Sequence, residues 1–166
     1  MQREERIAVV PGSFDPITKG HMDIIRRARP LFDKVIVLVV INAVKNPCFS
    51  LQERVELIRD SVADLPGVEV DCYKGLLVDY VKQVGACAIV KGLRAVSDFE
   101  YEFQQALINK KLYSGVETVF LTTSAVNQYL SSSVVKQIAS LGGDIRPFVP
   151  DQVHDRIVRR LRQAEV

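Results

Sequence analysis

Cysteine and histidine are scarce in this sequence of 166 residues, which contains three cysteines and two histidines. The cysteines, Cys48, Cys72 and Cys87, are too few and too widely spaced for a disulfide framework, and none forms a CxxC pair. Only His21 and His154 could complete a soft-metal site, so we expect no structural zinc. A chain without disulfides suits a reducing compartment, and we therefore expect a cytoplasmic location.

Long apolar runs and an excess of one charge are absent as well. No stretch of about 18 apolar residues occurs, so we expect no transmembrane helix and no membrane partner. The charged residues 1–6 lack the apolar region of a signal peptide. The 22 basic and 20 acidic residues leave a net charge of +2, without the basic stripe or aromatic platform that would predict a nucleic-acid partner.

What the sequence does contain is enough apolar residues for one globular core. Domains average about 150 residues, so we expect a single domain over residues 1–166. Five short apolar runs are candidate β-strands: residues 6–10, 34–41, 68–73, 86–90 and 116–121. The second run is apolar on both faces, which is typical of a parallel strand covered by helices on both sides.

Helical patterns lie between these runs, at residues 20–32, 50–65, 76–84, 97–113, 131–141 and from 150 onward. Capping boxes that begin at Ser50 and Ser97 open the second and the fourth, and Gly85 stops the third. This alternation predicts an α/β fold: a doubly wound parallel five-stranded sheet, Rossmann-like, with C-terminal helices. Ligands of such sheets bind in the loops at the carboxyl ends of the strands.

The loop after the first strand has the composition of a phosphate site. Residues 11–22 read PGSFDPITKGHM, in which Gly12 permits a sharp turn beside Ser13. Gly20 and His21 fall at the start of a helix, where free N–H groups and the helix dipole attract anions. A histidine here could merely pack or cap the helix, but a Gly-His pair in the first turn favours a ligand site.

Thr18-x-Gly20-His21 matches the T/HxGH motif of a nucleotidyltransferase superfamily. Further motifs follow in order: PGSFDP at residues 11–16, KGLRA at 91–95, DFEYE at 98–102 and SSS at 131–133. The sequence thereby resembles the bacterial phosphopantetheine adenylyltransferases over roughly residues 7–158. The resemblance implies reversible transfer of the adenylyl group of ATP to 4′-phosphopantetheine, giving dephospho-coenzyme A and pyrophosphate in coenzyme A biosynthesis. It also implies Mg²⁺ held mainly through the ATP phosphates, a cytoplasmic homohexamer, and coenzyme A as a candidate feedback ligand.

That reaction joins two anions, so it needs cations and hydrogen-bond donors rather than a covalent nucleophile. The resemblance implies catalytic roles for His21, which stabilises the transition state, and for Lys45 and Arg94. The ATP-binding residues that it implies are Ser13, Phe14, His21, Gly92, Leu93, Arg94, Glu102, Asn127, Gln128, Tyr129, Leu130, Ser131, Ser132 and Ser133. The substrate-binding residues that it implies are Ser13, Lys45, Leu77, Lys91 and Asn109. We expect no protein side chain as a direct metal ligand, and we interpret Asp15 as a turn residue.

Several of these residues also have an ordinary structural interpretation. Lys45 could be a solvated loop lysine, Glu102 a surface carboxylate and Leu77 part of the core. Serines at a helix start are common N-caps, which applies to residues 131–133.

The sequence departs from the family in places. Lys91 stands where many relatives have arginine, which keeps the charge but loses bidentate geometry. Gln137 replaces a frequent glutamate, and Asn127 replaces a frequent aromatic residue. The alternatives for the whole chain are another acceptor, such as nicotinamide mononucleotide or glycerol phosphate, and a nucleotide sensor without catalysis.

Overall fold

The computed structural model describes residues 4–41 and 46–163. Five parallel strands form one sheet: β1 (Ile7–Gly12), β2 (Lys34–Val40), β3 (Val68–Tyr73), β4 (Ala88–Leu93) and β5 (Glu117–Thr122). Their order is β3-β2-β1-β4-β5. From β1 the chain runs to one edge of the sheet through β2 and β3, and then returns to β4 on the other side of β1 and continues to β5. The point between β1 and β4 is the switch point of a doubly wound sheet. The predicted parallel sheet of five strands is confirmed.

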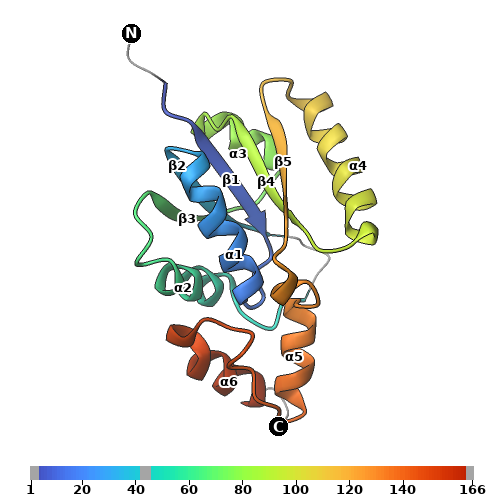
Figure 1. The fold of residues 1–166 in the computed structure, drawn as a ribbon. Coiled ribbons are helices and arrows are strands. Elements are labelled where there is room, and N and C mark those ends of the chain that lie inside the picture. Colours follow the sequence, from blue (N-terminus) through green and yellow to red (C-terminus); the bar gives the residue numbers. More distant parts are fainter. Residues whose placement is uncertain (1–3, 42–45, 164–166) are drawn as a thin grey trace.

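Helices cover both faces of this sheet (Figure 1). On one face lie α1 (Lys19–Ala28) and α2 (Leu51–Ser61), and on the other α3 (Leu77–Val84) and α4 (Val96–Leu112). Successive side chains of a strand point to opposite faces. Accordingly, Ala8 and Val10 of β1 join the core under α1 and α2, whereas Val9 joins the core under α3.

The chain ends in α5 (Ser132–Ser140) and α6 (His154–Gln163), which lie beyond the carboxyl end of β1 (Figure 1). Short 3₁₀ turns precede or follow these elements: η1 (Arg29–Leu31), η2 (Ala125–Asn127) and η3 (Asp151–Val153). Arg156 of α6 forms ion pairs with Glu56 and Asp60 of α2. Within residues 4–41 and 46–163, no helix is long and apolar enough to cross a membrane.

Two predicted helix boundaries are confirmed. The Ser50 hydroxyl accepts from the Glu53 amide, while the Glu53 carboxylate accepts from the Ser50 amide, which is a complete capping box. Gly85 ends α3 in the left-handed conformation, at φ 66°, which glycine adopts without the steric cost that a Cβ brings.

Other boundaries differ from the prediction. The capping box predicted at Ser97 is wrong, because α4 begins at Val96 after Ala95, which supplies no side-chain cap. Strands β1 and β4 run past their predicted ends, because Gly12 still pairs with Val39 and Leu93 with Thr122. Most of the KGLRA motif therefore lies in a strand rather than in the loop that follows it.

Candidate active site

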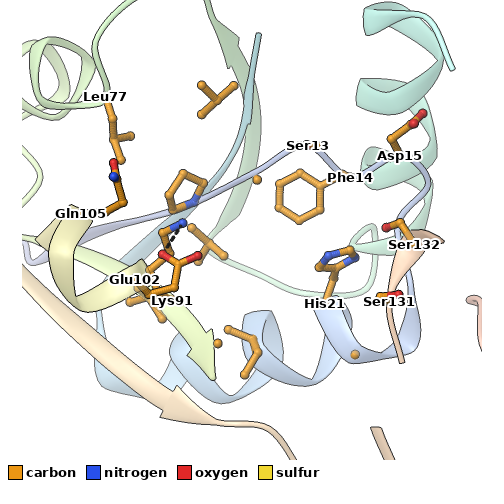
Figure 2. Close-up of a pocket in the computed structure, with 18 of the residues that line it drawn as sticks. Ser13, Phe14, Asp15, His21, Leu77, Lys91, Glu102, Gln105, Ser131 and Ser132 are labelled. Atoms are coloured by element: carbon orange, nitrogen blue, oxygen red, sulfur yellow. Dashed lines mark ion pairs between the residues drawn. The ribbon is translucent and has the colours of Figure 1, made fainter. Parts of the chain in front are cut away.

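A cleft of about 1140 Å³ opens at the carboxyl ends of β1 and β4. Segments that are far apart in the sequence form its walls: the turn after β1, the start of α1, the end of β4, one side of α4 and the start of α5. Figure 2 shows Ser13, Phe14 and His21 at one end of this cleft, beside Ser131 and Ser132. The structure thus brings the turn after β1 (the first turn, residues 13–18) close to residues 131–133 (the serine turn), as expected for loops at the ligand edge of the sheet.

The opposite end of the cleft combines an ion pair with apolar and amide side chains. Lys91 Nζ lies 3.0 Å from Glu102 Oε2, and the two side chains are 24% and 19% exposed. Glu102 is therefore not the solvated surface carboxylate that the sequence allowed. Leu77 and Gln105 lie at the same end (Figure 2), and Asn109, one helical turn after Gln105 on α4, also lines the cleft.

The imidazole of His21 has different partners at its two nitrogens. Thr18 is the N-cap of α1, and its backbone N–H donates to His21 Nδ1 at 3.1 Å while its hydroxyl accepts from the His21 amide. A backbone N–H can only donate, so Nδ1 is the acceptor and the proton of the neutral ring lies on Nε2. Within the described residues, Nε2 has no hydrogen-bond partner. His21 both caps the helix and offers one free N–H donor.

The surroundings of His21 keep it uncharged. Burial, and secondarily the positive charge of Arg94, lower the pKa of His21 from 6.5 to about 4. The Phe14 ring packs against the imidazole edge-on, with the ring centroids 4.9 Å apart. At neutral pH the side chain is thus a neutral N–H donor, suited to bind an oxygen anion rather than to transfer a proton.

The turn before α1 is held by a buried carboxylate. Asp15 accepts from the amides of Cys48 and Phe49, at 3.0 and 2.9 Å, and pairs with Lys136 Nζ of α5 at 2.8 Å. It therefore connects its own turn to the loop before α2 and to α5.

The sharp bend in this turn occurs at Phe14, with φ 49°, rather than at Gly12 as predicted. Gly12 is needed for another reason, since a Cβ there would lie 3.0 Å from the Phe14 ring. Gly92 lines the cleft as well, and its lack of a Cβ leaves room for Ile24 of α1. A Cβ on Gly92 would lie 2.8 Å from Ile24 Cγ1.

Arg94 joins the end of β4 to the serine turn. Its Nη1 donates to the Leu130 carbonyl at 2.9 Å, and its Nε donates to Asp98 at 3.1 Å. Ser131 is the N-cap of α5 and accepts from the Val134 amide, and Ser132 donates to the Pro16 carbonyl. The serines therefore cap the helix and tie it to the first turn, and the start of α5 faces the cleft.

Comparison with known proteins decides the family. Residues 9–138 match the family model described as cytidylyltransferase-like. A protein named phosphopantetheine adenylyltransferase from Caldanaerobacter subterraneus subsp. tengcongensis is 57% identical, over 96% of this chain and 99% of that protein. A second protein named phosphopantetheine adenylyltransferase, from Dictyoglomus turgidum, is 54% identical, over 93% of this chain and 97% of that protein. The chain belongs to the phosphopantetheine adenylyltransferase family. The resemblance seen in the motifs is confirmed.

A solved structure shares the fold of this phosphopantetheine adenylyltransferase family member. It is a bifunctional NMN adenylyltransferase/ADP ribose pyrophosphatase from Francisella tularensis, with a TM-score of 0.71 at 16% identity. The match covers 94% of this chain and 49% of the other, so the chain spans about half of that protein. At this identity the match supports the fold alone.

The structure places several expected ATP-binding residues outside the cleft. Asn127 and Tyr129 line a second hollow beside the outer side of α1, and Tyr129 packs edge-on against Phe148. Gln128 donates to the Arg94 carbonyl, while Leu93 does not line the cleft. In contrast, Leu130 and all three serines of the SSS motif do line it. Lys45, expected as a catalytic and substrate-binding cation, lies outside the described residues.

Sequence reasoning missed Arg54 and Lys136, which both line the cleft. Arg54 is 5% exposed. One signal for it was available, because residues 51, 54, 55 and 58 lie on one helix face, and the other three are apolar. An arginine in the apolar face of an otherwise amphipathic helix indicates a polar target behind that face.

The acidic side chains that line the cleft, Asp15 and Glu102, both have protein partners. The Asp15 carboxylate is occupied by two amides and Lys136. Within the described ranges, no group of three or more histidine, cysteine or acidic side chains could hold a metal.

Proposed function

We propose that this chain transfers the adenylyl group of ATP to 4′-phosphopantetheine, forming dephospho-coenzyme A and pyrophosphate reversibly. The observation that carries this proposal is the free Nε2–H of a neutral His21, located where the first turn and the serine turn meet. We infer that this donor stabilises the charge that develops on the α-phosphate during transfer.

The His21 end of the cleft has the donors that a triphosphate requires. The start of α5 presents Ser131, Ser132 and Ser133, and helix starts attract phosphate through free N–H groups and the helix dipole. Arg94 adds a guanidinium whose charge is partly offset by Asp98. Bound Mg²⁺ would neutralise phosphate charge at this end, held by the phosphates and water.

The other end of the cleft suits the acceptor. Leu77 offers apolar contact, Asn109 offers an amide, and Lys91 offers a cation for the acceptor phosphate. Lys91 Nζ pairs with Glu102, so we infer that the acceptor phosphate competes with this carboxylate. Lys45 remains part of the proposal as a second phosphate-binding cation.

We also infer a cytoplasmic homohexamer built from trimers. Helix α4 exposes large apolar side chains on two sides: Val96, Phe99, Phe103 and Leu107 lie on one side, while Tyr101, Ile108 and Leu112 line the cleft. Large exposed apolar patches on soluble proteins mark association surfaces, and α4 lies at the side of the sheet with an uncovered outer surface (Figure 1). Light scattering should give six times the chain mass of 18.6 kDa. Coenzyme A, which extends the product by one phosphate, would act as feedback ligand in the same cleft.

Pyrophosphate release measured with ATP, Mg²⁺ and a panel of acceptors tests the function. We expect release with 4′-phosphopantetheine and little with nicotinamide mononucleotide or glycerol phosphate. Release with another acceptor alone would assign a different transferase reaction. ATP binding without release on any acceptor would instead identify a nucleotide sensor.

A further inference from the structure

Arg54 reaches the first turn from the buried side of α2. Its Nη1 donates to the Ser13 carbonyl at 2.9 Å, and its Nε donates to the Ser50 carbonyl at 3.4 Å. The residue is 5% exposed and lines the cleft. Arg54 thus connects the start of its own helix to a turn 41 residues earlier in the chain.

The guanidinium of Arg54 has carbonyl partners but no carboxylate partner. It forms no ion pair with any residue in the part of the chain that the structure describes. Removing a cation from water without a counter-charge is costly. A bound anion in the adjoining cleft would supply that counter-charge.

The contact with Ser13 also sets the direction of an amide. The Ser13 carbonyl and the Phe14 N–H belong to one planar trans peptide unit, so they point in opposite directions. Because Arg54 holds the carbonyl, the Phe14 N–H points away from Arg54. In the described residues this N–H has no hydrogen-bond acceptor. Phe14 also has φ 49°, which few residues other than glycine adopt, so the turn depends on contacts that hold it.

We propose that Arg54 is a positioning residue: it orients the Ser13–Phe14 peptide so that the Phe14 amide donates to a phosphate oxygen of ATP. This inference rests on the proposed function for its ligand and adds a residue that the sequence motifs do not include. The positive charge of Arg54 strengthens ATP binding, because the phosphates supply the counter-charge that the buried guanidinium lacks.

The test compares binding of Mg²⁺-ATP with binding of adenosine, in the absence of any acceptor. Arg54→Gln removes the charge and retains a donor, Arg54→Lys retains the charge, and Arg59→Gln changes an exposed arginine of the same helix as a control. We expect Arg54→Gln to weaken ATP binding by about tenfold or more, as for loss of a charged hydrogen bond, with adenosine affinity unchanged. Arg54→Lys should recover part of the loss, and Arg59→Gln should match the wild type.

An equal loss for ATP and adenosine, or an ATP affinity within twofold of wild type in Arg54→Gln, overturns the proposal. If Arg54→Gln does not fold, crystals of the wild-type protein with ATP decide the matter. The Phe14 amide should then lie within about 3.2 Å of a phosphate oxygen, and a phosphate bound without that contact contradicts the proposal. Normal ATP binding without pyrophosphate release would refute the transfer reaction alone, whereas a wild type that binds no ATP refutes both.

Discussion

The Thr18 amide donates to His21 Nδ1 at 3.1 Å, and this contact determines which nitrogen of the imidazole carries the proton. The same pair closes the capping box of α1, since the Thr18 hydroxyl accepts from the His21 amide. A local helix-capping interaction thereby orients the N–H donor that we propose for the transfer reaction.

Removing the ring should abolish most turnover. Loss of one donor to a transition-state oxyanion costs about 3 kcal/mol, or roughly a hundredfold in kcat. Glutamine at this helix position can complete a capping box, so His21→Gln should keep the stability of α1 while His21→Ala loses it. Pyrophosphate release and thermal unfolding of both variants check this, with His154→Gln as the control. A kcat within a few-fold of wild type for His21→Gln would remove His21 from the mechanism.

The lowered pKa of His21 predicts a pH dependence of stability. Between pH 4 and 6.5 the unfolded chain binds a proton at this residue that the folded chain does not. Stability should therefore decrease as the pH falls from 6.5 towards 4, and His21 should have no effect above 6.5. Urea unfolding at pH 5 and 7.5 measures the change, which should be smaller in His21→Gln. The kcat of the wild type should show no His21 titration between pH 6 and 8, and an inflection there that disappears in His21→Gln would contradict this.

Asp15 should matter for folding rather than for metal binding. Replacing it with asparagine places an amide donor among two backbone donors and Lys136. Removing one partner of a buried, hydrogen-bonded pair commonly costs about 3 kcal/mol, so Asp15→Asn should unfold at a clearly lower denaturant concentration. Lys136→Met should cost less, because the carboxylate keeps its two amide donors. If both variants keep wild-type stability, Asp15 does not hold the turn.

Gly92 should tolerate no side chain, whereas Gly20 should. A Cβ on Gly92 would lie 2.8 Å from Ile24, while a Cβ on Gly20 meets nothing closer than 3.5 Å. Forcing an extra methyl into a packed site typically costs about 1–3 kcal/mol. Gly92→Ala should lose about that much stability in the wild type, and it should cost less when it is introduced into Ile24→Ala. Denaturant unfolding of the single and double variants provides the measurement, and strict additivity would argue against the predicted clash.

Hydrophobic patterning was sufficient to predict the order of strands and helices, because short apolar runs and helical periodicity follow burial directly. The Ser50 capping box and the Gly85 stop were also predictable, since both depend on neighbours a few residues away. The Ser97 box was wrong, because the N-cap of α4 is Ala95, two residues before the expected N-cap. The local pattern cannot show where β4 ends. Strand ends were missed because pairing across β4 and β5 is a tertiary property.

The candidate site was predictable where its residues share a motif. His21 and the serines at 131–133 were found because each motif is contiguous. Arg54 was missed because its partner, Ser13, lies far away in the sequence, although its place on an apolar helix face was visible. The outward position of Tyr129 depends on Phe148, a contact that no local pattern contains.

The continuity of the cleft from His21 to Leu77 has a kinetic consequence. A molecule that joins the adenylyl and pantetheine halves contacts both ends together, so each half raises the effective concentration of the other. Such a product should have a longer residence time than either substrate, because it dissociates only when the contacts of both halves are broken at the same time. Rapid-quench experiments should then show a burst of pyrophosphate in the first turnover, followed by a slower steady rate set by product departure.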